Sequence, residues 1–498
     1  MLKPDYLDKL PSRVVDLYAE EEIRILEDMA RRISKMEAFT DTATWQLWKL
    51  EQIGASREFI QSHLQRLTGK TQGEINALLV DAGEKALYYD DKIYRAAGLK
   101  PSALKNNPAL QRVIGAGLKK TMRLFANLTG TTANTATRQF ENALDLAYMD
   151  ITSGAFSYQE AIKRAVKSLA GPGLDAITYP SGHTDKLDVA VRRATLTGVN
   201  QTAAQVSETR AAEMGCDLVE TTAHVGARPA HAAWQGKVFS RSGKSRKYPD
   251  FVKSTGYGSG PGLCGWNCRH SFYPYFEGLS KKAYTRQDLT ELEKKRVTYR
   301  GKELTLYEAT QEQRNIERKI RQWKREYMAL DAAGLDTSEA SVKLAAWRVA
   351  QTDFLEETGL KADNFRGQVT GFGRKEAARA RAQFERKLLP NRKTAILPKE
   401  KFYNYALNKN GLGKDKAIAF EKALGYTISN AEDLIADIYK NLSRYPAKMR
   451  PSNQYGQPFE VIMELTGPNG KTARVKTGWI LRNDQKSPRL TTVYIAKR

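Results

Sequence analysis

Apolar residues recur every three or four positions through the first two fifths of the chain, which is the spacing of helices that bury one face. Leu26, Met29, Ile33 and Met36 illustrate this spacing, since all four fall on one side of a helix. The pattern predicts several separate helices over residues 1–215. The glycines expected to end these helices are Gly69, Gly98, Gly171 and Gly215.

Two helix starts are marked by paired polar residues. Thr71 precedes Glu74 by three positions, and Ser157 precedes Glu160 by the same interval. At that spacing each side chain can accept a hydrogen bond from an amide that the first helical turn leaves unpaired. The sequence therefore predicts that one helix begins near Thr71 and another near Ser157.

The helical spacing gives way to shorter runs between about residues 216 and 280. Runs of β-prone residues at 218–222 and 237–240 are separated by Gly, Pro and aromatic residues. This texture predicts a small α+β domain that follows the helical part.

Residues 281–390 return to charged helices. Apolar residues in this region follow a heptad-like order, and Gly334 then separates two arms of a predicted hairpin whose second arm includes residues 342–355. Because the pattern is short, we expect the hairpin to pack on a neighbouring element and not to form a free-standing coiled coil. The heptad-like residues are Ile316, Ile320, Trp323, Tyr327 and Leu330.

The last part of the chain combines helices with an antiparallel meander. Pro390 and Pro398 bracket a predicted linker. Strands are expected where apolar and polar residues alternate, and the turn where Gly, Pro and Asn cluster. The expected strands are 459–465, 473–481 and 490–496, with a turn at 467–470.

The fold class that follows is multi-domain α+β, with a mostly helical N-terminal part, a small α+β domain, a helical hairpin and a C-terminal α+β domain with an antiparallel sheet. A chain of 498 residues also exceeds what one hydrophobic core usually organises. The predicted divisions are residues 1–215, 216–280, 281–390 and 391–498.

The net charge of the chain indicates what kind of partner it has. Lys and Arg total 80 against 56 Asp and Glu, which gives a formal net charge of +24. Solubility needs far less charge than this, so we expect a polyanionic partner, and nucleic acid is the first candidate. Residues 391–498 carry 20 of these cations against 9 acidic residues.

The opening residues lack the apolar core of a secretion signal, and no stretch approaches the roughly 18 apolar residues of a membrane span. We therefore expect no membrane partner. The three cysteines, Cys216, Cys264 and Cys268, are too few for a disulfide framework, which favours synthesis in a reducing cytoplasm.

The most distinctive motifs lie between Ala227 and Pro274. They comprise residues 227–231, the run from His231 to Ser240, residues 248–251 and 255–258, and residues 262–274. In this order they resemble the phage minor capsid protein 2 family, related to the minor head proteins typified by the F protein of phage Mu. With the helical part, the resemblance covers roughly residues 1–390.

The resemblance implies a virion protein present in few copies, located inside the head beside the portal, and in the host cytoplasm during assembly. Its implied partners are portal and capsid proteins, and packaged DNA bound without sequence preference. Its implied role is to assist head assembly or to travel with the DNA.

Soft metal ligands are concentrated in the same motifs. Cys264, Cys268 and His270 fall within seven residues, and His224 or His231 could complete a tetrahedral zinc shell. The spacing is not that of a standard zinc finger. The alternative is a compact loop in which His231 and His270 bond the backbone and the cysteines are buried thiols, and the residues favour this alternative slightly over structural zinc.

A cationic loop between these motifs is the predicted nucleic-acid contact. Its residues are Arg241, Lys244, Arg246 and Lys247. Contacts from such a loop to DNA phosphates would be independent of sequence and sensitive to salt. A solvated loop, or a contact to an acidic portal surface, explains the same residues equally well.

Residues 403–408, 413–416, 465–470, 475–479 and 488–490 form an ordered set of motifs in the C-terminal part. The set resembles an uncharacterised domain found at the ends of bacterial toxin-like and phage proteins, which has been grouped with metal-independent ribonucleases of the barnase, colicin and RelE type. This resemblance implies a second hypothesis, a head protein that delivers a nuclease effector. No histidine follows His270, so catalysis would need cations and hydroxyls. The candidate residues are Lys401, Lys416, Thr477, Arg489 and Thr492. For each, an exposed charge or a strand-surface hydroxyl is the simpler interpretation.

Other enzyme classes lack their motifs. The sequence has no Gly-x-x-x-x-Gly-Lys-Ser/Thr phosphate loop and no Gly-x-Ser-x-Gly elbow. A third hypothesis is a stand-alone DNA-binding protein with a zinc knot. The virion protein remains the leading hypothesis.

Overall fold

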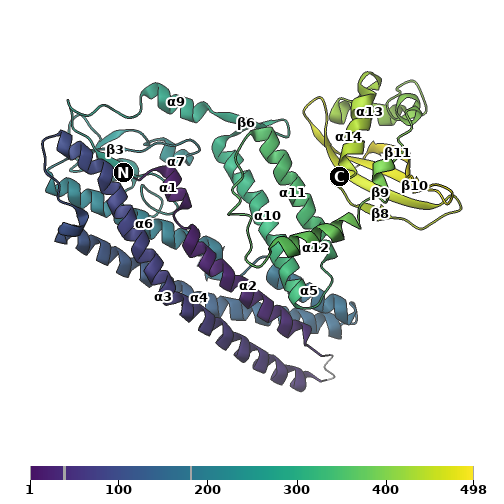
Figure 1. Cartoon of the computed structure of the whole chain (residues 1–498), viewed down its shortest axis with the longest axis horizontal. Helices are drawn as coiled ribbons and strands as arrows, with labels where there is room; N and C mark the ends of the chain where they lie inside the picture. Colours follow the sequence, from purple (N-terminus) through teal and green to yellow (C-terminus); the bar gives the residue numbers. More distant parts are fainter. Residues whose placement is uncertain (1, 38–40, 180–181, 497–498) are drawn as a thin grey trace.

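The computed structural model describes residues 2–37, 41–179 and 182–496. The molecule is elongated, with long N-terminal helices at one end, a helical hairpin in the middle and a compact β-rich domain at the other end (Figure 1). This arrangement confirms the predicted multi-domain α+β class.

Long helices that pack side by side form the N-terminal body. Helix α3 would extend about 80 Å at 1.5 Å per residue. Apolar faces of these helices meet in one large core, in which Leu26, Ile33 and Phe140 are buried. The helices of this body are α1 (Pro4–Lys9), α2 (Ser12–Ser34), α3 (Thr42–Ala96), α4 (Pro108–Thr152), α5 (Tyr158–Ala170) and α6 (Leu187–Glu213).

One predicted helix boundary is wrong and another is confirmed. Helix α3 continues through Gly69, and Thr71 is buried within it and caps nothing. A glycine costs a helix only about 1 kcal/mol, which burial against α2, α4 and α6 outweighs. At α5, by contrast, Ser157 and Glu160 form the reciprocal capping pair that their spacing predicts.

The predicted helix ends near three glycines are confirmed. Gly98 and Gly215 follow α3 and α6 with φ of +78° and +63°, a conformation that glycine adopts without steric cost. Gly171 directly follows α5, in an ordinary right-handed conformation. A short two-stranded ribbon, β1 (Asp175–Thr178) with β2 (Thr184–Lys186), separates α5 from α6.

The central module holds a three-stranded antiparallel sheet in the order β4-β3-β5. Both predicted strands are present, and residues 272–274 supply the third. Short helices lie in the connecting loops. The elements are β3 (Leu218–Thr221), α7 (Pro229–Ala232), β4 (Val238–Ser240), α8 (Phe251–Thr255) and β5 (Phe272–Pro274).

The predicted hairpin is confirmed, and it packs on the N-terminal body. Ile316, Ile320, Tyr327 and Leu330 are buried in the same core as the N-terminal helices, and Trp323 packs against that core. Gly334 follows the first arm with φ of +69°. The elements of this region are α9 (Arg286–Lys294), β6 (Arg296–Tyr299), β7 (Lys302–Thr305), α10 (Leu306–Ala332), α11 (Ser338–Thr358) and α12 (Arg374–Glu385).

The C-terminal domain has its own core around Trp479, Val461 and Phe420. Its antiparallel sheet has the order β11-β10-β9-β8 and contains the three predicted strands. The predicted linker is instead part of this domain, because Ile396 pairs with Arg489 at the sheet edge. The elements are α13 (Lys414–Leu424), α14 (Ala431–Asn441), β8 (Ala447–Met449), β9 (Gln457–Thr466), β10 (Thr472–Leu481) and β11 (Arg489–Ile495).

Within the described ranges, none of the helices combines the length and the apolar character that crossing a bilayer requires.

Candidate functional site

The loop that carries the predicted metal ligands is held by close backbone approaches. A Cβ atom at Gly262 would lie 2.0 Å from the carbonyl oxygen of Gly256, so only glycine fits there. Cys264 and Asn267 adopt positive φ angles of 56° and 52°, which side chains rarely do. Buried Asn200 on α6 donates to the carbonyl oxygens of Cys268 (3.1 Å) and His270 (3.2 Å).

Three of the predicted ligands meet where this loop contacts α7. His231, Cys268 and His270 are buried, and one ligand atom from each lies within 4.8 Å of the others. Cys268 Sγ lies 3.8 Å from His231 Nδ1 and 3.7 Å from His270 Nδ1. Around a tetrahedral zinc, sulfur and nitrogen ligands are about 3.5 Å apart, so this spacing is close to that of a metal shell.

The Nε2 atoms of His231 and His270 already have hydrogen-bond partners. His231 Nε2 lies 2.8 Å from the carbonyl oxygen of Pro261, and His270 Nε2 lies 3.2 Å from Gln235 Oε1. Both oxygens accept, so each Nε2 carries the proton and each Nδ1 presents a lone pair to Cys268. The single thiol proton of Cys268 can be donated to only one of these two Nδ1 atoms at a time. Metal-bound histidines show the same outer hydrogen bonds.

Burial keeps the cluster neutral in its protein-only form. Burial and the neighbouring histidines and arginines together lower the pKa of His270 to about 2. Burial also lowers the pKa of His231 and raises that of Cys268. Near pH 7 the imidazoles therefore present lone pairs, as a metal ligand must.

The two other predicted ligands adjoin this triad but are not part of it. Cys264 Sγ is 3.6 Å from the carbonyl oxygen of His270 and is fully buried among apolar side chains. The ring of His224 stacks on that of His270 at 4.3 Å between centroids, and its Nδ1 lies 2.9 Å from the carbonyl oxygen of Val225. Cys264 is thus a buried thiol, as the simpler interpretation of the motif expects.

The triad borders a cavity of about 580 Å³ that sequence reasoning missed. Its walls come from α1, α6, α10, the segment after α11, and two loops around residues 224–231 and 266–270. These walls carry eight arginines against three acidic residues. Only the overall positive charge hinted at such a site, because the arginines are spread over 175 positions. They are Arg192, Arg193, Arg228, Arg269, Arg314, Arg318, Arg321 and Arg366.

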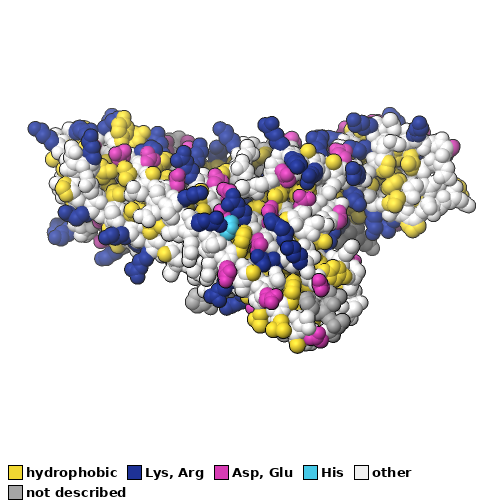
Figure 2. Space-filling view, turned by 60° about the horizontal axis from the view of Figure 1, so that its bottom comes forward, with side chains coloured by type: hydrophobic (Ala, Val, Ile, Leu, Met, Phe, Trp, Pro, Cys, Tyr) yellow, Lys and Arg dark blue, Asp and Glu magenta, His cyan; other side chains and the backbone are white. Residues whose placement is uncertain are grey.

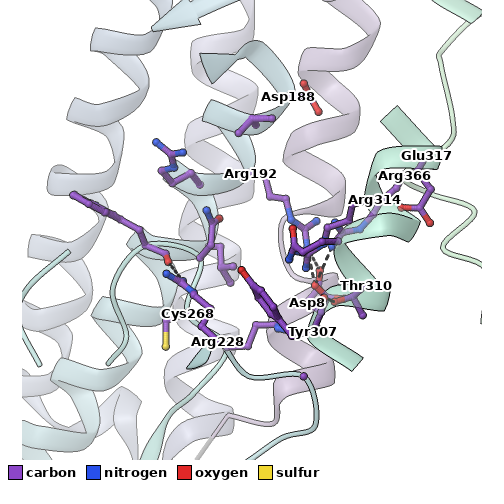
Figure 3. Close-up of a pocket in the computed structure, with 18 of the residues that line it drawn as sticks. Asp8, Asp188, Arg192, Arg228, Cys268, Tyr307, Thr310, Arg314, Glu317 and Arg366 are labelled. Atoms are coloured by element: carbon purple, nitrogen blue, oxygen red, sulfur yellow. Dashed lines mark hydrogen bonds and ion pairs between the residues drawn. The ribbon is translucent and has the colours of Figure 1, made fainter. Parts of the chain in front are cut away.

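Asp8, at the end of α1, is the central anion of this cavity. Arg192 and Arg366 approach its Oδ1 atom at 2.8 and 3.3 Å, and Figure 3 shows these residues and Arg314 gathered around it. The surrounding guanidinium groups lower the pKa of Asp8 against the opposing effect of burial. The carboxylate therefore stays ionised and holds several arginines in place.

The four residues of the predicted DNA-contact loop differ in burial. Arg241 is largely buried and donates to the carbonyl oxygens of Cys216 (2.8 Å) and Glu208 (3.2 Å), so it supports the loop from inside. Lys244, Arg246 and Lys247 are exposed, and Lys247 pairs with Glu277. Figure 2 shows Lys and Arg side chains along the whole length of the face in view, interleaved with acidic ones.

Two of the five predicted catalytic residues of the tail meet. Lys416 Nζ donates to Thr492 Oγ1 at 3.2 Å and lies over the ring of Tyr405. Thr477 is fully buried, donates to the carbonyl oxygen of Val461 and accepts from Trp479, which is a structural role. Among the described residues, the side chains of Lys401 and Arg489 make no hydrogen bond or ion pair with the Lys416–Thr492 pair.

Comparison with known proteins identifies the family. A family model described as phage minor capsid protein 2 matches residues 2–356, more than half of the chain. The chain belongs to the phage minor capsid protein 2 family. The matched region contains the N-terminal body, the triad, most of the arginine cavity and most of the hairpin, and it confirms the resemblance drawn from the motifs.

Curated relatives of this minor capsid family member come from two phages. A "Structural protein" of Lactococcus phage LL-H is 29% identical over 212 residues, which is 41% of this chain and 54% of the relative. A "Structural protein" of Lactococcus phage mv4 is 32% identical over 117 residues, 22% of this chain and 85% of the relative. The match thus spans about half the length of the LL-H protein. No solved structure matches.

The tail is similar to a different family. A domain of unknown function (DUF6883) matches residues 388–497. That description names no toxin or nuclease, so the toxin-like resemblance remains a prediction.

Proposed function

We propose that this chain is a minor structural component of a bacteriophage head that lies beside the portal, inside the shell, and contacts packaged DNA. The single observation that carries the proposal is the family match over residues 2–356. The net charge of +24 supports a position next to a polyanion. Its partners would be portal and capsid proteins, with assembly in the host cytoplasm.

Phosphate contact would come from Lys244, Arg246 and Lys247, the exposed cations of the predicted DNA-contact loop. Three contacts give an affinity that falls roughly 40-fold between 50 and 200 mM salt, and the rest of the basic surface adds to this. We expect the triple variant Lys244→Ala, Arg246→Ala and Lys247→Ala to bind a random 30-base-pair duplex more weakly. Fluorescence anisotropy should show its log–log salt slope reduced by about 2.7.

A matched variant tests whether the position of the charge matters. Arg57, Arg66 and Lys70 are exposed on α3, and their replacement by alanine removes the same charge. We expect this control to leave more of the salt slope in place. Equal slopes for both variants would show that the loop has no special part in DNA contact, and a flat salt response of the intact chain would reject the phosphate contact itself.

We further propose that His231, Cys268 and His270 bind a zinc ion through three protein ligands, with a fourth position left for water or another ligand. The converging lone pairs and the outer hydrogen bonds support this proposal. Elemental analysis of the intact protein, produced in zinc-supplemented medium, should find about one zinc per chain. Cys268→Ser should lose it, whereas Cys216→Ser, which alters a buried thiol in another cluster, should keep it. Absence of zinc from the unaltered protein would remove the proposal.

The second hypothesis, a C-terminal ribonuclease, rests on the Lys416–Thr492 pair. A cation beside a hydroxyl can bind a phosphate and stabilise developing charge. The burial of Thr477 and the separate positions of Lys401 and Arg489 leave this pair without the other predicted groups, so the structural role is the stronger proposal.

A further inference from the structure

The arginine cavity carries more positive charge than its own acidic residues balance. Arg193 pairs with Asp185, and Arg321 pairs with Asp188. Arg192 and Arg366 share Asp8, and Arg366 also binds Asp363 at 2.6 Å. Four arginines of the cavity have no carboxylate within ion-pair distance anywhere in the described part of the chain. They are Arg228, Arg269, Arg314 and Arg318.

The pKa of Arg314 shows the effect of this excess positive charge. Arg314 lies on α10 beside Arg366 and Arg192, and Figure 3 shows it directed at the same space as both. Burial and the neighbouring guanidinium groups of Arg366 and Arg269 lower its pKa to about 10. The same causes lower the pKa of Arg192. Arginines that lower one another's pKa in a half-buried wall are typical of a site that an anion completes.

Glu317 does not supply the missing charge. It is buried on α10 beside the cavity, and its Oε2 atom has no hydrogen-bond partner among the described residues. Burial and the nearby Asp363 raise its pKa to about 7, although Arg366 and Arg314 oppose the shift. Near neutral pH this carboxyl is therefore partly protonated, which leaves the cavity with two or more uncompensated positive charges.

We propose that this cavity binds a phosphate or diphosphate group with at least two negative charges, carried by a free nucleotide or by the 5′ end of a nucleic acid. A dianion matches the excess better than a single carboxylate, and guanidinium groups bind phosphate oxygens in pairs. The volume of about 580 Å³ suits a small ligand and is too small for a duplex. Tyr307 and the half-exposed ring of Trp266 also line the cavity and offer surfaces for a base.

Thermal unfolding of the intact chain with five probes tests the proposal. The probes are inorganic pyrophosphate, ADP, adenosine, and a short oligonucleotide with or without a 5′ phosphate. Pyrophosphate or ADP at 100 times its Kd should raise the melting temperature by about 3–6 °C, and adenosine should not. Stabilisation by the oligonucleotide only when it carries the 5′ phosphate would identify a nucleic-acid end as the source, whereas stabilisation by ADP alone would identify a free nucleotide.

Arg314→Gln separates a binding role from a structural one. Because the arginine has no carboxylate partner and is repelled by its neighbours, the variant should melt at the same temperature as the unaltered chain or higher without ligand. Its affinity for pyrophosphate should fall at least tenfold. Lys343→Gln removes one exposed charge from α11, outside the cavity, and should leave that affinity unchanged.

Three results would overturn the proposal. The first is that no phosphate probe stabilises the chain at millimolar concentration. The second is that Arg314→Gln binds pyrophosphate as well as the unaltered chain does. The third is that an acidic peptide stabilises the chain where pyrophosphate does not, which would identify the cavity as a docking site for carboxylates of a partner protein.

Discussion

Arg210→Met is expected to lower the free energy of unfolding of the helical body by about 3–5 kcal/mol. Arg210 on α6 is fully buried, its Nε lies 3.5 Å from Asp91 Oδ1 on α3, and it donates to the carbonyl oxygen of Ser102. Methionine fills similar space but leaves buried Asp91 without its cation. Urea denaturation followed by helix circular dichroism at pH 8 measures the loss.

The pH dependence of this loss has a definite sign. Burial raises the folded-state pKa of Asp91 above its unfolded value, and Arg210 opposes that shift. Stability from a protonated buried carboxyl is present below the unfolded pKa and is lost as pH rises through the folded pKa. The deficit of Arg210→Met should therefore be smaller at pH 5 than at pH 8.

A surface arginine provides the control for Arg210. Arg24 pairs with Glu21 at 2.9 Å on α2, but half of its side chain is exposed. Arg24→Met should cost no more than about 0.5 kcal/mol. If Arg210→Met cost as little as Arg24→Met, the buried pair would not hold α6 to α3.

Gly117→Ala is expected to destabilise the helical body by about 1–3 kcal/mol, although the same change usually stabilises a helix. Helices α4 and α6 touch at two reciprocal points. A Cβ at Gly117 would lie 2.9 Å from Thr202 Cβ, and one at Gly198 would lie 3.1 Å from Thr121 Cβ and closer to its hydroxyl. Neither threonine can move away without shifting its helix. Thermal unfolding of the full chain measures the effect.

Gly115 offers a matched comparison on the same helix. A Cβ at this position would meet no atom within 4 Å, so Gly115→Ala should raise the free energy of unfolding by about 0.5–1 kcal/mol. The two alanine variants should thus shift stability in opposite directions. A stabilising Gly117→Ala would mean that α4 and α6 are not in close contact at this crossing.

Local signals in the sequence predicted elements well when one local interaction decides the structure. The Ser157–Glu160 pair starts a helix, and alternation between residues 459 and 481 forms paired strands. Gly69 was misjudged because a weak local preference was opposed by burial along α3, which no local pattern reports. The segment before Pro398 was misjudged for the same reason, since its pairing partner lies more than 90 residues away.

The candidate site shows the same division. The triad could be proposed because two of its ligands are two residues apart and the third belongs to the same motif set. The arginine cavity could not, because Asp8, Arg192 and Arg314 meet only after α1, α6 and α10 pack together. Arg241 and Thr477 show the converse error, in which a polar residue of suitable type turned inward to serve the fold.

Quantitative mass spectrometry of purified phage particles and precursor heads tests whether this chain is a minor component of the phage head. We expect the chain to be present in both at a few copies per particle, far below the major capsid protein, and cross-links should join it to the portal. Its absence from particles and precursors, although it is expressed during infection, would contradict a structural role in the head.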